Sequence, residues 1–237
     1  MSTSTQTVAP DVVTVRGLTA GYGGTPAVHQ VDLDVAPGQI AVLLGANGAG
    51  KTTTLLALAG ELRPMGGSVS VLGCPAGARL EKRARAGMGF LTEGRCVLMG
   101  LTGWENLRLG RGAPQHALEY FPELEDHLGK KAGLLSGGQQ QMLALGRILA
   151  SEPRLILADE LSLGLAPLVV QRLLGALRAA ADDGVAVVLV EQHVRHALTV
   201  ADRGYVLRRG RVVLTGSGAE LAADADSIAE HYISGEI

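Results

Sequence analysis

Aromatic side chains are scarce in this chain, which has two phenylalanines, four tyrosines and one tryptophan among 237 residues. So few rings cannot supply the stacking platform on which single-strand binding proteins hold bases. Positive charge is not in excess either, because the formal net charge is −2 and no overall basic field attracts nucleic acid. We therefore expect no nucleic-acid partner.

Cysteine and long apolar runs are also lacking. Cys74 and Cys96 are too few for a disulfide framework, and two isolated thiols are typical of a reducing cytosol. No apolar run approaches the roughly 18–20 residues that cross a bilayer. Residues 1–11 are mostly polar and lack the charged start and apolar segment of a secretory signal, so we expect a flexible tail. Any membrane association is then expected to run through another chain.

What the chain does have is a glycine-rich run between the apolar segment Ile40–Leu44 and a helix-like segment at 53–59. The run consists of Gly45, Ala46, Asn47, Gly48, Ala49, Gly50, Lys51 and Thr52, with Thr53 following. Such a turn is an anion cradle, because its backbone N–H groups and the positive helix end converge on phosphate oxygens. In this P-loop pattern Lys51 reaches the β- and γ-phosphates and the hydroxyl of Thr52 ligates Mg²⁺.

Two further motifs carry chemistry. The apolar run 155–158 is followed by Asp159 and Glu160, which are placed to hold Mg²⁺ and to act on a water molecule, respectively. The second motif begins a predicted helix and forms another phosphate-binding nest. It consists of Ser136, Gly137, Gly138 and Gln139, preceded by Leu135. Two anion sites with one nucleotide pocket suggest that they meet across a dimer interface.

The order of the elements predicts a mostly parallel α/β sheet that is covered on both faces. Antiparallel strand patterns come first, and helical segments broken by glycine and proline occupy about 97–152. We expect further strands at 154–159, 185–190, 204–208 and 211–215, a helix at 168–182 and a final helix after the last strand.

In chain order the P-loop comes first, then Leu-Ser-Gly-Gly-Gln, then Asp159-Glu160. This arrangement resembles the ATP-binding subunit of an ABC transporter over about residues 12–233, and Leu-Ser-Gly-Gly-Gln is that family's signature. The resemblance implies one ATP-binding domain at 12–237, with a RecA-like P-loop NTPase core, an antiparallel β subdomain and an inserted α-helical subdomain at about 97–152. It implies ATP hydrolysis with Mg²⁺, Tyr22 stacked on adenine, and Glu160 polarising the attacking water. Ser136, Gly137 and Gly138 would contact the γ-phosphate of ATP held by the opposite subunit.

Three positions depart from the family pattern. Glu93 stands where most members have the Q-loop glutamine, and it either ligates Mg²⁺ or faces the transporter partner. Gln192 occupies the position of the switch histidine, with His193 one place later. Leu161 replaces the proline that usually follows the catalytic glutamate, and the D-loop at 163–166 lacks its common aspartate.

The first two departures are themselves similar to one branch of the family. Thr92-Glu93-Gly94 and Val190-Glu191-Gln192 resemble the second ATP-binding subunit of branched-chain amino-acid importers, and urea and short-amide importers share much of this pattern. The resemblance implies a second ATP-binding subunit, identical or different, two transmembrane permease subunits and an extracytoplasmic solute-binding protein. It places the chain at the cytoplasmic face of the cell membrane, with permease contact near residues 93–99.

Two other classes remain as alternatives. A non-transport ABC ATPase acting on DNA or ribosomes usually carries a long coiled coil or two ATP-binding domains, and this chain shows neither. A switch GTPase has a guanine-reading Asn-Lys-x-Asp run, which is absent here and would leave the signature unexplained.

Two smaller expectations concern individual side chains. We expect Gln192, rather than His193, to face the phosphate, although a glutamine can donate a hydrogen bond without carrying charge. We expect the basic run at residues 79–85, which includes Arg83, to form a solvated face.

Overall fold

The computed structural model describes residues 11–94 and 96–230, and its strands form two separate sheets. The smaller sheet is antiparallel, with the strand order β2-β1-β4-β5. Its strands are β1 (Val13–Tyr22), β2 (Thr25–Val35), β4 (Gly66–Val71) and β5 (Cys74–Pro75). The expected flexible tail, apart from Asp11, lies outside the described residues.

The larger sheet has the order β10-β9-β3-β8-β7-β6 and is parallel except for β10, which pairs antiparallel with β9. Its strands are β3 (Ile40–Leu44), β6 (Met88–Leu91), β7 (Leu155–Asp159), β8 (Ala186–Glu191), β9 (Arg203–Arg208) and β10 (Arg211–Ser217). The expected fold class, an antiparallel sheet beside a parallel P-loop-type core, is confirmed.

The parallel sheet is buried on both faces, and its strands alternate between two hydrophobic clusters. In β3, Ile40, Val42 and Leu44 belong to one cluster, whereas Ala41 and Leu43 belong to the other. Successive side chains of a strand point to opposite faces, so a continuous apolar run serves a sheet covered on both sides.

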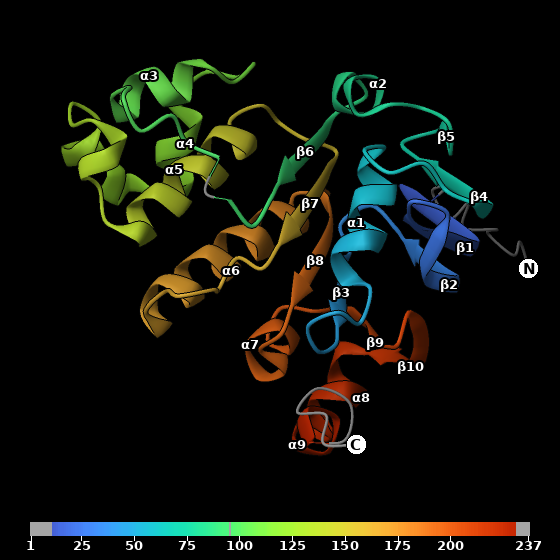
Figure 1. Cartoon of the computed structure of the whole chain (residues 1–237). Coiled ribbons are helices and arrows are strands. Elements are labelled where there is room, and N and C mark those ends of the chain that lie inside the picture. The colour runs from blue at the N-terminus through green and yellow to red at the C-terminus, as the bar shows by residue number, and fades with distance from the viewer. Residues whose placement is uncertain (1–10, 95, 231–237) are drawn as a thin grey trace, which may run out of the picture.

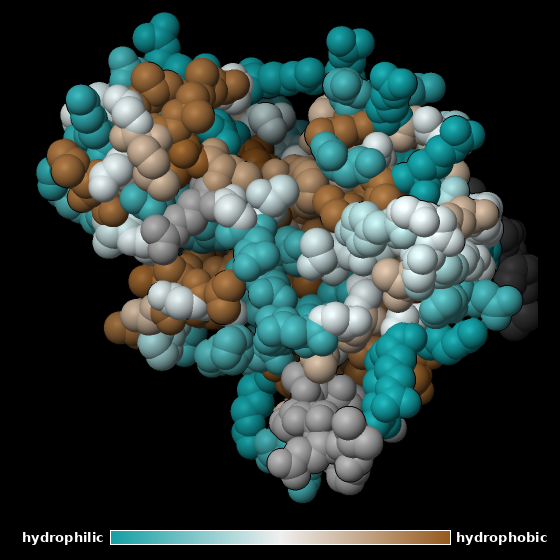
Figure 2. Space-filling view, viewed as in Figure 1, coloured by the Kyte–Doolittle hydropathy of each residue, from teal (hydrophilic) through white to brown (hydrophobic). Residues whose placement is uncertain are grey.

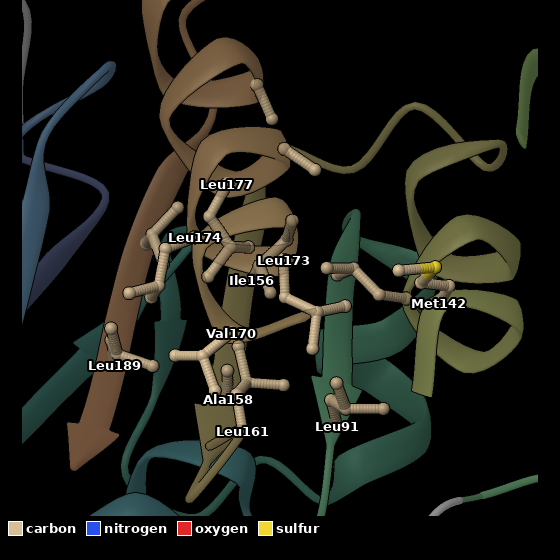
Figure 3. Packing of buried hydrophobic residues seen from close by; sticks show 14 of the residues in the cluster. Leu91, Met142, Ile156, Ala158, Leu161, Val170, Leu173, Leu174, Leu177 and Leu189 are labelled. Carbon is tan, nitrogen blue, oxygen red and sulfur yellow. The ribbon is translucent and has the colours of Figure 1, made fainter. Parts of the chain in front are cut away.

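Helix α6 (Pro167–Asp182) covers one of these faces (Figure 3). Its buried apolar side chains lie against β7 and β8, together with Leu161 from the preceding loop. The labelled residues in this layer include Val170, Leu173, Leu174 and Leu177 of α6 with Ile156, Ala158 and Leu189 of the strands. Leu161 therefore fills a core position directly after Glu160.

Helix α1 (Lys51–Ala59) lies on the other face, between the two sheets (Figure 1). The later helices of the core are α7 (Val194–Leu198), α8 (Gly218–Ala223) and α9 (Ala225–Ile228). Among the described residues, none of the helices is both long enough and apolar enough to cross a membrane.

The chain between β6 and β7 forms a helical lobe at the upper left of Figure 1. It contains α3 (Gly103–Arg108), α4 (His116–Tyr120), the 3₁₀ turns at Pro122–His127 and Ala132–Leu134, and α5 (Gly137–Leu149). Gly146 allows α5 to approach α4 closely, because a Cβ there would lie 3.2 Å from Cβ of Ala117. The lobe thus packs around α5, whose first turn carries the signature residues.

The expectation that the basic run at residues 79–85 forms a solvated face is wrong for one residue, Arg83. Residues Leu80–Arg85 form helix α2, and the side chain of Arg83 is fully buried. Its Nη1 donates to the carbonyl oxygens of Ala57, at 2.7 Å, and Leu58, in the last turn of α1. A cation at this end of α1 adds a donor for carbonyls of the last turn and opposes the negative end of the helix dipole.

Candidate functional site

Three neighbouring strands of the parallel sheet end at the same edge, and each leads into a segment with predicted site residues. Strand β3 leads into the P-loop, β7 ends at Asp159, and β8 ends at Glu191. The register places Leu44 beside Glu191 and Asp159 beside Val190. Because the carboxyl ends of parallel strands align, segments far apart in sequence meet here, as at the ligand-binding edge of other open α/β sheets.

A cavity of about 210 Å³ lies at this edge. Its lining consists of Ala27, Asn47, Gly48, Gly50, Lys51, Thr52, Thr53 and Glu160. Glycine is required at position 50, where φ is 105° and a Cβ would lie 2.5 Å from Cγ1 of Val28. The glycine-rich run therefore packs directly against β2 while its outer side faces the cavity.

Lys51 is a buried cation that is held in place by the P-loop backbone. Its side chain is 4% exposed, and Nζ donates to the carbonyl oxygens of Gly45 at 2.8 Å and Ala46 at 3.1 Å. Nζ also lies 3.7 Å from Oε1 of Glu160. Burial lowers the pKa of Lys51, and the charges of Glu160 and Asp159 oppose that shift. The lysine is thus positioned beside the cavity before any ligand arrives.

Asp159 is a buried carboxylate whose pKa is raised to about 6, mainly by burial. Thr52 donates to its Oδ1 at 3.4 Å, which opposes the shift, whereas the charges of Glu160 and Glu93 add to it. Glu93 itself is solvent-exposed. One lysine therefore faces several carboxylates, and a cation at this place would relieve the shortage of positive charge. A threonine hydroxyl and a carboxylate are oxygen ligands of the kind that Mg²⁺ takes.

Gln192 connects the P-loop to Glu160. Its Nε2 donates to Oδ1 of Asn47 at 2.6 Å and to Oε1 of Glu160 at 2.8 Å. Glu160 has φ of +48°, an uncommon backbone conformation for a residue other than glycine, and its N–H donates to the carbonyl oxygen of Val190. The structure therefore brings Gln192, and not His193, into contact with Glu160.

His193 lies at the N-cap of α7, where its ring approaches Ser162. Nδ1 of His193 is 3.1 Å from Oγ of Ser162, and the ring stacks on that of His196 with centroids 5.9 Å apart. Ser162 in turn donates to the buried carboxylate of Glu191. Neither Ser162 nor Glu191 was predicted as a site residue, because no local pattern shows that these segments meet.

The signature residues lie at the start of α5, and none of them lines the cavity. Oγ of Ser136 accepts from the N–H of Gln139 at 3.2 Å, while Oε1 of Gln139 accepts from the N–H of Ser136 at 2.9 Å. Gly137 is the first helical residue. Gly138 lets the helix start pack on α6, because a Cβ there would lie 2.8 Å from Cγ1 of Val169. A single chain thus keeps its two expected anion sites apart.

Tyr22 closes β1 opposite Thr25 in the hairpin that continues into Ala27, a cavity-lining residue. The ring is 55% exposed and is not part of the cavity wall. An exposed ring on the hairpin beside the P-loop has a free face for stacking.

Comparison with known proteins agrees with this geometry. Residues 28–162 match the family model described as ABC transporter. The chain is 39% identical to the high-affinity branched-chain amino acid transport ATP-binding protein BraG of Pseudomonas aeruginosa, over 90% of this chain and 96% of that protein. It is 32% identical to a probable branched-chain amino acid transport ATP-binding protein, LivF, of Archaeoglobus fulgidus, over 86% and 91% of the two chains.

A solved structure adds information about assembly. The chain superposes with a TM-score of 0.76 and 26% identity on a dimeric structure of a post-hydrolysis state of the ATP-binding cassette MJ0796 bound to ADP and Pi. The match covers 86% of this chain and 98% of that one. A cassette of this fold is thus known as a dimer with nucleotide.

Proposed function

We infer that this chain powers an importer of branched-chain or other hydrophobic amino acids, from the premise that it belongs to the ABC transporter family. The chain is an ATP-binding, ATP-hydrolysing subunit of an ABC transporter. The choice of solute rests on the match to BraG across nearly the whole of both chains, and on LivF. An importer of urea or short amides is the alternative solute class.

The cavity at the carboxyl edge of the sheet is proposed as the ATP site. Residues Gly45–Thr53 would surround the phosphates, with Lys51 neutralising the β- and γ-phosphates and Tyr22 stacking on adenine. The observation that carries this assignment is the position of Lys51, buried and already hydrogen-bonded to the P-loop backbone at the wall of the cavity. Holding a charged donor in place before binding avoids reorganisation during the reaction.

The oxygens of Thr52 and Asp159 fit Mg²⁺, and Glu93 is a third candidate through its charge near Asp159. The ion would supply positive charge to the transferred phosphoryl group. The pKa of Asp159 is raised to about 6, and a bound cation would lower that pKa and so hold the carboxylate ionised in mildly acidic solution as well. Glu93 is exposed two residues after the end of β6, so it can equally face the permease.

Glu160 is proposed as the base that polarises the attacking water, and Gln192 as the switch residue that orients it. The two side chains already share a hydrogen bond of 2.8 Å at the cavity. Gln192 keeps the geometry of such a contact but brings no positive charge, so turnover is expected to be slower than with a charged histidine there. His193 is proposed to act elsewhere, on Ser162.

The signature residues are proposed to complete the ATP site of a second ATP-binding subunit, identical or different. Ser136, Gly137, Gly138 and Gln139 present a helix start that lies outside the cavity of their own chain. An N-terminal helix turn is an anion site, and the partner's γ-phosphate is its proposed ligand. Two such contacts, related by symmetry or pseudo-symmetry, would close two nucleotides between the subunits.

We place permease contact at residues 93–99 and the adjoining lobe, which we propose as a subdomain at about 97–152 within a domain at 12–237. The side chains of Leu98 and Met99 are 54% and 47% exposed. The backbone of Leu98 is nevertheless held in place, because its N–H donates to Oδ1 of the buried Asn106 at 2.8 Å and its carbonyl oxygen accepts from Nδ2 of Asn106 at 3.1 Å. Figure 2 shows hydrophobic surface on this lobe. Arg95 lies outside the described residues. Two permease subunits would hold the chain at the cytoplasmic face of the membrane.

Reconstitution separates the proposals on function. The chain is to be expressed with its adjoining permease and ATP-binding genes, purified in detergent and placed in vesicles with the solute-binding protein. Leucine-loaded binding protein should stimulate ATP hydrolysis, and Glu160→Gln should abolish both hydrolysis and uptake. Stimulation by urea alone would support the amide class, whereas recovery with ribosomes or DNA in place of permeases would contradict transport.

The assignment of the switch residue has a separate test. Gln192→Ala should lower turnover by about ten- to hundredfold, the range expected for losing a hydrogen bond to a charged group. His193→Ala should have the smaller effect. Loss of hydrolysis in His193→Ala with full activity in Gln192→Ala would exchange the two roles.

A further inference from the structure

Glu191 is a buried carboxylate at the end of β8 that the reaction described above does not use. It is 2% exposed, and both of its oxygens accept hydrogen bonds from one residue, Ser162. The Ser162 N–H donates to Oε1 at 3.0 Å and the Ser162 hydroxyl donates to Oε2 at 2.6 Å. Burial raises the pKa of Glu191, and the two bonds from Ser162 oppose that shift. Ser162 is therefore the main compensation for burying this group.

The hydrogen-bond chain continues to the surface through His193. The Ser162 hydroxyl has one proton, and the 2.6 Å contact uses it as a donor to Glu191. With Glu191 ionised, the Ser162 oxygen is free to accept at 3.1 Å from Nδ1 of His193 in the tautomer that carries a proton on Nδ1. In that state the donors run in one direction, from the imidazole through the hydroxyl to the carboxylate. His193 is not among the residues that line the cavity.

The hydrogen bonds among Ser162, Glu191 and His193 join the two loops that carry the proposed reaction. Ser162 stands two residues after Glu160, in the loop between β7 and α6. Glu191 and His193 are the two neighbours of Gln192. Both sides of Gln192 are therefore tied to the loop of Glu160, while Gln192 itself reaches Glu160 and Asn47. A shift of Ser162 would move the backbone on both sides of the Gln192–Glu160 contact.

We propose that Ser162, Glu191 and His193 form a positioning latch. The latch holds Gln192 against Glu160 and fixes the conformation of the loop after Glu160 that hydrolysis requires. The latch rests on the proposed function, because its effect is on hydrolysis. His193, the residue after the switch position, thus anchors the switch segment through its Nδ1 proton instead of contacting the phosphate.

The latch predicts a change in turnover that plain loss of stability would not produce. Ser162→Ala leaves one oxygen of Glu191 and Nδ1 of His193 without the hydroxyl, while the P-loop is untouched. In the assembled transporter, kcat should fall about tenfold with KM for ATP unchanged within about twofold, because one hydrogen bond to a charged group is lost. Ser151→Ala is the matched control: Ser151 Oγ donates to the Ile148 carbonyl oxygen at 2.7 Å, away from the cavity.

Conservative replacement at His193 provides the second readout. The amide nitrogen of an asparagine can stand near the position of Nδ1 and donate to Ser162, but it cannot titrate. His193→Ala should lower kcat by roughly threefold and His193→Asn should restore it, since one neutral hydrogen bond is removed and then replaced. Full activity in His193→Ala, or equal loss in both variants, would remove His193 from the latch.

The outcomes separate this inference from the proposed function. Glu160→Gln serves as the reference in the same preparation. If Ser162→Ala and Ser151→Ala share the same kcat while Glu160→Gln is inactive, the latch is wrong and the ATPase assignment stands. If Glu160→Gln keeps full activity, the proposed function itself fails. Equal losses of melting temperature in the two serine variants, with kcat lowered only in Ser162→Ala, would support the latch.

Discussion

The N-termini of helices α1 and α5 are the two proposed anion sites, and they are built differently. Gly50 at the N-cap of α1 makes no side-chain hydrogen bond, and the first helical residue is the buried Lys51. At α5, Ser136 and Gln139 satisfy each other in a capping box, and the first turn carries no charged residue. The P-loop end thus has its own cation for a phosphate, whereas the signature end has none, which supports the proposal that it completes a nucleotide site held by another chain.

An arginine lies near the opposite end of each helix. The buried Arg83 binds carbonyl oxygens in the last turn of α1, and Arg147 in the last turn of α5 donates to the carbonyl oxygen of Cys96. Burial lowers the pKa of both guanidinium groups, mostly without a carboxylate partner to oppose it. The difference between the helices therefore lies at the phosphate-facing end, where α1 has its own cation and α5 does not.

Removing that cation should produce the largest effect. Lys51→Met keeps much of the side-chain volume but leaves the cavity beside Asp159 and Glu160 without positive charge. We expect hydrolysis to fall by at least about a thousandfold and ATP binding by the single chain to be lost, because the γ-phosphate loses its charged donor. Phosphate release and fluorescent-nucleotide binding measure the two effects.

Lys82→Met is the control for Lys51→Met, since Lys82 is an exposed lysine on α2. Its activity should match that of the original chain. Retained ATP binding by the Lys51→Met chain would mean that the cavity does not depend on its own cation, and the contrast between α1 and α5 would disappear.

The next effect is on stability, at the far end of α1. Arg83→Met leaves the carbonyl oxygens of Ala57 and Leu58 without their buried donor. The free energy of unfolding should fall by about 3 kcal/mol, because buried carbonyl oxygens lose hydrogen bonds from a charged donor. Urea denaturation measures it, with the exposed Arg85→Met as control, expected within about 0.5 kcal/mol of the original chain. Equal stability of both variants would show that Arg83 does not cap α1.

Arg83 also shows where sequence reasoning ends. The P-loop, Asp159-Glu160 and the signature are local patterns, and the apolar run of β3 predicts a strand buried on both faces, so the core was predictable. Nothing local marks Arg83 as buried, because its run of basic neighbours is typical of solvated helices. The contact of Gln192 with Asn47, 145 residues away, arises only because β8 lies beside β3 in the sheet. The short elements β5, α2 and α7 were likewise not predicted, because such brief segments have no clear periodicity.

A change at the signature tests the other side of the comparison. In Ser136→Ala the hydroxyl that caps α5 is lost, while the cavity of the same chain keeps all its residues. ATP binding by the single chain should stay the same, and hydrolysis by the assembled subunits should fall about tenfold, equivalent to about 1.4 kcal/mol.

The chain offers a matched control for this change. Ser217 caps α8 in the same capping box, with Glu220 in place of glutamine. Ser136→Ala and Ser217→Ala should lose similar stability, about 1 kcal/mol each. Hydrolysis that falls equally in both variants would mean that α5 contributes only as a capped helix.

The smallest expected effect concerns the junction that holds α1 between the two sheets. The Tyr205 hydroxyl of β9 accepts from the Asp34 N–H and donates to the Asp34 carbonyl oxygen of β2, both at 3.1 Å. Tyr205→Phe should lower the free energy of unfolding by about 1 kcal/mol, a net value for these hydrogen bonds.

Burial raises the pKa of Tyr205 above 10, so the stability from this group is present below pH 10 and is lost as pH rises through the folded-state pKa. The difference in free energy of unfolding between the original chain and Tyr205→Phe should therefore be constant from neutral pH to about 9.5 and narrow above it.

In Tyr205→Phe, hydrogen exchange should quicken in α1 more than in α5, because Tyr205 belongs to the cluster that contains α1. Equal changes in both helices would show that the junction supports the whole molecule rather than the P-loop side.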